Sequence, residues 1–192
     1  MGDIHLPYTH RNYLQHCVDT YHKYSCNSVS FTGDLIDSHF ASFHHTSTET
    51  DGKYELTMAI EQMKEWYAAF NNDTVPNGIS VTLGNHDLII ARKAEDSGID
   101  KRWVRNLNEV LGCPDWVFEE QFVHDDVLYT HGTFINYTAS LTDLKWQLQA
   151  PCGIDYKSFA YGYAKFHTAK PVLGCAVVLD SGKLPIIEPM PL

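Results

Sequence analysis

Residues 28–37 read SVSFTGDLID, a short strand of β-branched and aromatic residues that turns at Gly33 and delivers Asp34 and Asp37. Residues 78–87 read GISVTLGNHD and repeat this arrangement, because an alternating strand again ends at a glycine before a polar loop. Glycine lets the backbone turn sharply, so that the next side chain points into a cleft above the sheet. Strands that alternate with helical patterns and end in such loops predict an α/β domain.

Two shorter segments carry side chains of the same kind. Residues 2–5 read GDIH, and residues 129–132 read YTHG at the end of a strand expected over residues 127–130. The four segments supply carboxylate, imidazole and amide groups, which are ligands that divalent metals accept. Their joint occurrence therefore predicts a site for two metal ions.

The hydrophobic periodicity predicts the other elements. Helices are expected over residues 10–24, over residues 56–70 and around residues 103–111, the last ended by Gly112 and Pro114. Residues 173–187 predict a hairpin that turns around Asp180, Ser181 and Gly182.

Composition restricts the classes of protein to which the chain can belong. A length of 192 residues with 44% hydrophobic and 12% aromatic residues predicts one folded domain over residues 1–192. The sequence contains neither a long apolar run nor a basic and apolar leader, so we expect a soluble, cytoplasmic protein without a membrane partner. A net charge of -10 does not favour binding to nucleic acid, and small phosphate substrates fit this charge better.

In order and spacing, the four segments resemble the calcineurin-like metallophosphoesterases, whose motifs run D-x-H, G-D-x-x-D, G-N-H-D/E, H-G and G-H-x-H. The tract from Cys152 onward is also similar to that of phage-type members of this family, which would place the protein in a host cytoplasm. The resemblance implies mixed β-sheets flanked by helices. It also implies hydrolysis of phosphate monoesters or diesters with two divalent ions, for which Mn, Fe, Zn and Ni all stay open.

The resemblance further implies which residues hold the metals. Asp34 is expected to bridge the two ions, with Asp3 and His5 on the first ion and Asn85 and His131 on the second. Such a pair of ions generates hydroxide at neutral pH and neutralises a phosphoryl group.

Two further residues are expected to take part in catalysis. His86 would protonate the leaving oxygen, and the Asp37 carboxylate would orient the His86 imidazole and raise its pKa. Asp87 is expected to be a loop or cap residue rather than a ligand.

The sequence departs from the family pattern at two places. The strand that should precede D-x-H is reduced to Met1, so the segment with Asp3 and His5 is expected to have little β-ladder to fix it. The G-H-x-H motif is absent, and His167 is the one histidine beyond His131 that is available to replace it. The fold is therefore expected to be incomplete and the activity impaired.

Two other functions stay open at this point. The chain is alternatively a catalytically inactive metal-binding or interaction module that keeps the fold, or a nuclease. The polar loop after Asp37, with His39, His44 and His45, is either a lid near the substrate or a solvated surface loop.

Overall fold

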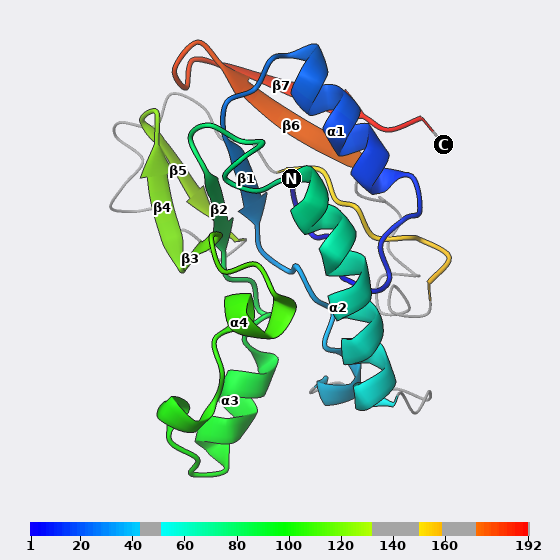
Figure 1. Ribbon diagram of the computed structural model, residues 1–192, viewed down its shortest axis with the longest axis vertical. Helices are drawn as coiled ribbons and strands as arrows, with labels where there is room; N and C mark the ends of the chain where they lie inside the picture. The colour runs from blue at the N-terminus through cyan, green and yellow to red at the C-terminus, as the bar shows by residue number, and fades with distance from the viewer. Residues whose placement is uncertain (43–50, 132–149, 159–171, 192) are drawn as a thin grey trace.

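In the computed structural model, a parallel sheet of three strands carries the two glycine-turn motifs (Figure 1). Its strands pair in the order β1-β2-β3, and the structure adds two antiparallel hairpins, β4 with β5 and β6 with β7. The strands are β1 (Val29–Thr32), β2 (Ile79–Thr82), β3 (Val117–Glu119), β4 (Gln121–His124), β5 (Val127–Thr130), β6 (Gly174–Leu179) and β7 (Leu184–Pro189). A parallel sheet and antiparallel sheets with flanking helices confirm the predicted α/β fold class, although no single sheet among the described residues mixes the two kinds of pairing.

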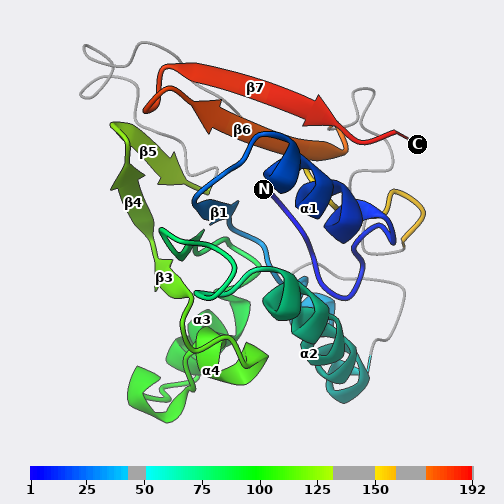
Figure 2. The same cartoon turned by 45° about the horizontal axis from the view of Figure 1, so that its top comes forward.

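Helices pack around these strands. In both views α1 lies along the β6–β7 hairpin, whereas α3 and α4 lie at the end of the molecule away from that hairpin (Figures 1 and 2). The helices are α1 (Tyr13–Lys23), α2 (Gly52–Ala69), α3 (Ile89–Asp96) and α4 (Leu107–Leu111), with the 3-10 turns η1 (His39–Ala41) and η2 (Lys101–Trp103). The predicted helices over residues 10–24 and 56–70 and the C-terminal hairpin are thus confirmed.

Stacked aromatic side chains anchor β1 in the core. The ring of Phe31 stacks on Trp116 with centroids 4.7 Å apart, and Trp66 of α2 meets Phe31 at 5.8 Å. The buried Trp116 indole donates a hydrogen bond of 3.0 Å to the carbonyl of Phe70, as a buried indole N–H requires. Phe31 therefore packs against both Trp66 and Trp116, and these contacts fix β1 just before the loop that carries Asp34.

The first residues of the chain run beside β1 without forming a ladder. Leu6 makes a parallel bridge to Ile36, and Gly2 makes one to Cys152. Ile4 and Leu6 are buried in the core cluster. The expected shortage of β-ladder is confirmed. The segment is nevertheless not a loose tail, because backbone hydrogen bonds join it to residues 34–35 on one side and to residues 151–153 on the other.

The helix predicted around residues 103–111 was wrong in part. The chain forms η2 and α4 there as two separate elements, because Val104 and Asn106 between them take extended backbone angles. Trp103, which was expected on the buried face, is exposed. Gly112 ends α4 with a φ of 72°, as predicted.

The structure describes residues 1–42, 51–131, 150–158 and 172–191. His44, His45 and His167 lie outside these ranges, as do residues 132–149 in the region where the missing motif is expected. Within the described ranges, no helix is both long enough and apolar enough to span a membrane.

Candidate metal centre

Asp34 lies at the centre of the site, directly after β1. Its backbone takes a left-handed φ of 49° after Gly33, and its side chain is buried. The Oδ1 atom accepts a hydrogen bond of 2.9 Å from the backbone N–H of His86. The Oδ2 atom lies 3.7 Å from Nε2 of His5 and 3.2 Å from Nε2 of His131. One carboxylate oxygen is therefore approached by two imidazoles from distant parts of the chain.

Both of these imidazoles are held from behind through Nδ1. His5 Nδ1 lies 2.7 Å from Oδ1 of Asp37, and His131 Nδ1 lies 2.6 Å from the carbonyl oxygen of Thr32. A carboxylate or carbonyl oxygen accepts, so the proton of each ring sits on Nδ1. Each Nε2 is thereby presented toward Asp34, which is how metal-binding histidines are commonly oriented.

Two groups of ligand atoms share Asp34. His5, Asp34 and His86 form one group and Asp3, Asp34 and His131 form the other, with the ligand atoms of each group within 4.8 Å of one another. This pairing differs from the expected one, in which Asp3 and His5 serve the same ion. The reason is local, because Asp3 and His5 have left-handed φ values of 42° and 53° and do not lie on an extended segment.

Asn85 belongs to the side of the site that holds His131. Its Oδ1 atom lies 3.2 Å from Nε2 of His131, so the expected pair of Asn85 and His131 comes together. Asp3 Oδ1 lies 3.7 Å from the same ring. Asp3 and Asn85 thus both lie beside the His131 ring, next to Asp34.

His86 and Asp37 come together through a different atom from the expected one. His86 Nδ1 lies 2.5 Å from the backbone carbonyl of Asp37 and 3.7 Å from the carboxylate. The carboxylate instead lies between two other rings, since its Oδ2 atom is 3.4 Å from Nδ1 of His39. The His86 ring packs edge-on against His5, with centroids 4.8 Å apart.

Two glycines allow the loops to approach closely. A Cβ at Gly84 would lie 2.1 Å from Oδ1 of Asp34, and one at Gly33 would lie 2.3 Å from Nδ1 of His131. Gly33 also has a φ of 86°, which side chains rarely allow. At Gly84 the requirement is the close approach, whereas the sequence had suggested only a sharp turn.

Asp87 links the loop that follows β1 to the loop that follows β2, and it belongs to neither ligand group. Its carboxylate accepts hydrogen bonds from the backbone N–H groups of Ile36 and Gly84, at 3.2 and 2.9 Å. Burial and the nearby charge of Asp34 raise the pKa of Asp87 to about 7, against the opposing effect of these two bonds. The expectation that Asp87 is a loop residue is confirmed.

The electrostatics of the site favour a bound cation. Burial raises the pKa of Asp34, but the hydrogen bond from His131 and the surrounding imidazoles outweigh it and lower the pKa overall. For His131, burial lowers the pKa, yet Asp34, the Thr32 carbonyl and Asp3 raise it to about 9. Because its Nδ1 proton is already donated, Nε2 needs a second proton or a metal ion between itself and the oxygens of Asp34 and Asn85. The donor set therefore fits a divalent ion.

Sequence reasoning missed two residues behind this site. His39 was noticed only as part of a polar loop, but it lies against Asp37. Glu55 was not considered, although it shares a helix face with Ala59 and Met63 and is equally buried. A carboxylate on the apolar stripe of an amphipathic helix is the signal that identifies such a residue.

Comparison with known proteins agrees with this geometry. A family model for calcineurin-like phosphoesterases matches residues 1–162. No curated protein and no solved structure matches the chain. The matched region contains all four motifs and both groups of ligand atoms, and the chain therefore belongs to the calcineurin-like phosphoesterase family.

Proposed function

We propose that the chain is a hydrolase of phosphate esters that works with two divalent metal ions. Membership of the family supports the reaction class. Two ions are supported by Asp34, which has His5 near it in one ligand group and Asp3 and His131 in the other. The observation that carries the proposal is the approach of His5 and His131 to the same oxygen of Asp34. When bound, such ions neutralise a phosphoryl group and activate water.

The metal ligands in this proposal are Asp3, His5, Asp34, Asn85 and His131. Asp34 reaches both groups, so it is the residue suited to bridge. The neutral amide of Asn85 adds an oxygen without adding negative charge that would repel a phosphate ester. Asp37 holds Nδ1 of His5, and the Thr32 carbonyl holds Nδ1 of His131, so both rings keep Nε2 available.

His86 is the proposed proton donor to the leaving oxygen. Its Nδ1 is tied to the Asp37 carbonyl, and its side chain is more exposed than that of His5, at 19% against 3%. An imidazole held at one nitrogen and open to the site is suited to transfer a proton near neutral pH. Asp37 acts in this scheme by positioning both His5 and His86.

The proposed role of His86 is tested by His86→Ala. We expect turnover of an aryl phosphate ester to fall by about 10²–10⁴-fold, the usual contribution of a general acid, while the bound metal content stays near that of the unmodified chain. His124→Ala is the matched control, because His124 is a half-exposed histidine on β4 next to Asp125. Loss of metal from the His86 variant would instead make His86 a ligand of the group that contains His5.

We expect the activity to be weak. The G-H-x-H motif is absent from the sequence, so each ion lacks an imidazole that the family pattern provides. Binding should therefore need excess divalent metal, and hydrolysis should be detectable only under that condition. Tight binding of two manganese ions in a calorimetric titration would contradict this expectation.

The same absence favours one second candidate, an inactive metal-binding or interaction module with the phosphoesterase fold. Metal stoichiometry and hydrolysis distinguish the two candidates. Two bound ions with turnover support the hydrolase, whereas one ion or none without turnover supports the module. A nuclease is less well supported, because a net charge of -10 opposes a polyanionic substrate.

A further inference from the structure

Glu55 is a buried carboxylate that the proposed mechanism does not use. It lies in the first turn of α2 and is 3% exposed. Carboxylates are rarely this buried unless they are paired, because removing them from water costs free energy that only partners offset. The partners of Glu55 therefore indicate its purpose.

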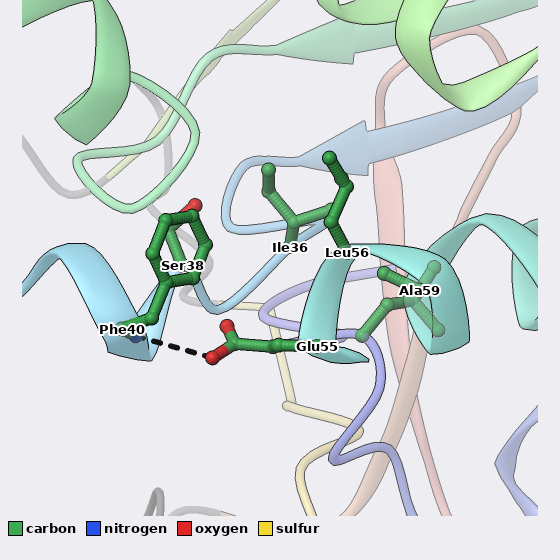
Figure 3. A pocket seen from close by; sticks show the side chains of 7 residues that line it. Ile36, Ser38, Phe40, Glu55, Leu56 and Ala59 are labelled. Atoms are coloured by element: carbon green, nitrogen blue, oxygen red, sulfur yellow. Dashed lines mark hydrogen bonds between the residues drawn. The ribbon is translucent and has the colours of Figure 1, made fainter. Parts of the chain in front are cut away.

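Those partners belong to the turn that follows Asp37. One carboxylate oxygen accepts the backbone N–H of His39 at 2.7 Å, and the other accepts that of Phe40 at 3.1 Å. Figure 3 shows the Glu55 side chain reaching from α2 to the backbone of η1, beside a small pocket. The Tyr8 hydroxyl also hydrogen-bonds this carboxylate. Glu55, which belongs to the packed helix α2, thus fixes the backbone of the turn at His39 and Phe40.

The turn leads directly to the metal centre. His39 Nδ1 lies 3.4 Å from Oδ2 of Asp37, and His5 Nδ1 lies 2.7 Å from Oδ1. The fully buried Asp37 carboxylate therefore lies between two imidazoles, hydrogen-bonded to His5 and in contact with the ring of His39. A chain of polar contacts runs from Glu55 through His39 and Asp37 to His5.

We propose that Glu55 is a positioning residue for the His5 side of the metal centre, acting through His39 and Asp37. The inference rests on the proposed function, since it assumes that His5 binds an ion. Glu55 holds His39 where its ring stops the Asp37 carboxylate from turning away from His5. His5 Nε2 then stays directed at Asp34. In the other ligand group, Nδ1 of His131 lies against the Thr32 carbonyl instead of Asp37, so the two groups are joined through the shared Asp34.

A merely structural role for Glu55 makes a different prediction. A carboxylate in the first turn of a helix is favoured by the helix dipole, and its loss would lower stability without selecting one metal ion. The positioning role predicts that one ion is weakened and the other is not. Selectivity between the two ions is therefore the decisive measurement.

The test is calorimetric titration of the full chain with manganese, comparing the unmodified protein with Glu55→Gln. We expect the variant to lose about 10–100-fold in affinity for one ion, as is usual for residues behind a ligand, with the other ion unchanged. His131→Ala identifies the other ion, because it removes a ligand of that group only. Glu61→Gln on the same helix is the control, since Glu61 is exposed and paired with Lys64.

Three results would overturn the inference. Unchanged affinities in Glu55→Gln, or equal loss at both ions, would leave the proposed function intact and remove the role of Glu55. Failure of the unmodified chain to bind two ions would overturn the proposed function, and this inference with it.

A second variant covers the case in which Glu55→Gln does not fold. His39→Asn keeps the backbone bonds to Glu55 and removes the ring beside Asp37, so it should weaken the same ion by a smaller factor. An unchanged affinity in His39→Asn would also overturn the inference. In both variants the nitrogen chemical shifts of the His5 ring, measured without metal, should show loss of the fixed Nδ1–H form.

Discussion

The two halves of the metal centre share Asp34 but differ in what stands behind them. On the His5 side, the ring is 3% exposed and is held by a carboxylate that is itself buried and flanked by His39. On the other side, Nδ1 of His131 lies against the backbone carbonyl of Thr32, and the Asp3 side chain is 42% exposed. A ligand with a buried polar chain behind it is oriented before the metal arrives, and this orientation reduces the cost of binding.

The elements that carry the two sides also differ in how closely they are packed in the core. The His5 side is built by β1, the N-terminal segment and α2, all of which pack in one core cluster. On the other side, Asp3 also comes from the N-terminal segment, but His131 follows β5, a strand whose residues are only half-buried or exposed. We therefore expect the His5 side to bind its ion more tightly than the other side.

The largest effect should come from Asp34→Asn, which changes the one residue that both halves share. The amide cannot supply a negative bridge, so both affinities should fall by more than the roughly 100-fold that outer residues contribute. Manganese titration measures both steps in one experiment. Asp100→Asn is the control, because that carboxylate is exposed and pairs with Arg102. Loss of only one ion would show that Asp34 does not bridge.

A smaller loss at both ions should follow from Gly84→Ala. The added methyl group would meet Oδ1 and the backbone nitrogen of Asp34 at 2.1 and 2.3 Å, so the carboxylate must move. We expect about 10–100-fold weaker binding at each ion, in line with disturbed ligand orientation. Gly98→Ala serves as the control. No described atom lies within 4 Å of its added methyl group, so this variant introduces backbone strain, at a φ of 74°, without a steric clash. Equal effects of the two variants on metal binding would contradict the steric explanation.

His5→Ala and His131→Ala should separate the two halves. Each should remove one ion, but His5→Ala should also lower the free energy of unfolding by about 3–5 kcal/mol, because it removes the ring that hydrogen-bonds the buried Asp37 carboxylate. His131→Ala should cost under about 1.5 kcal/mol, since it removes one hydrogen bond to a carbonyl at a more open position. Urea unfolding without metal measures both values. Equal destabilisation would contradict the difference between the halves.

The smallest effect concerns pH and the His131 side. The His131 pKa is raised from 6.5 to about 9, so between these values the ring is protonated in the folded chain and an entering ion must displace that proton. Metal affinity should therefore rise with pH up to about 9. Without metal the sign is opposite, because the stability that protonated His131 contributes is complete below pH 6.5 and is lost as the pH rises through about 9.

Calorimetry in two buffers of different ionisation enthalpy measures the displaced proton directly. The unmodified chain should release about one proton more than His131→Ala when metal binds near pH 7.5. Equal proton release from the two proteins would show that His131 is not the group displaced.

Local sequence was a good guide to the elements that bear on the core. Phe31 and Ile79 lie on strands that were expected, and Met63 lies on a helix whose apolar period was clear. The sequence did not identify α3, a helix of eight residues, or the short strands β3 and β4, which carry the exposed apolar residues Val117 and Val123. Strands that bury little apolar surface have little periodicity to detect.

By itself the sequence determined which chemical groups meet at the site, because each donor follows a strand or a glycine turn whose pattern is local. Only the tertiary structure decided how those groups are divided. Asp3 and His5 fall into different ligand groups because their left-handed backbone sends neighbouring side chains apart. The partners of Asp37 and Glu55 were equally beyond local reasoning, because they depend on which turns a folded core brings together. Short local segments determine which side chains form the site, whereas the orientation of those side chains depends on contacts between residues far apart in the chain.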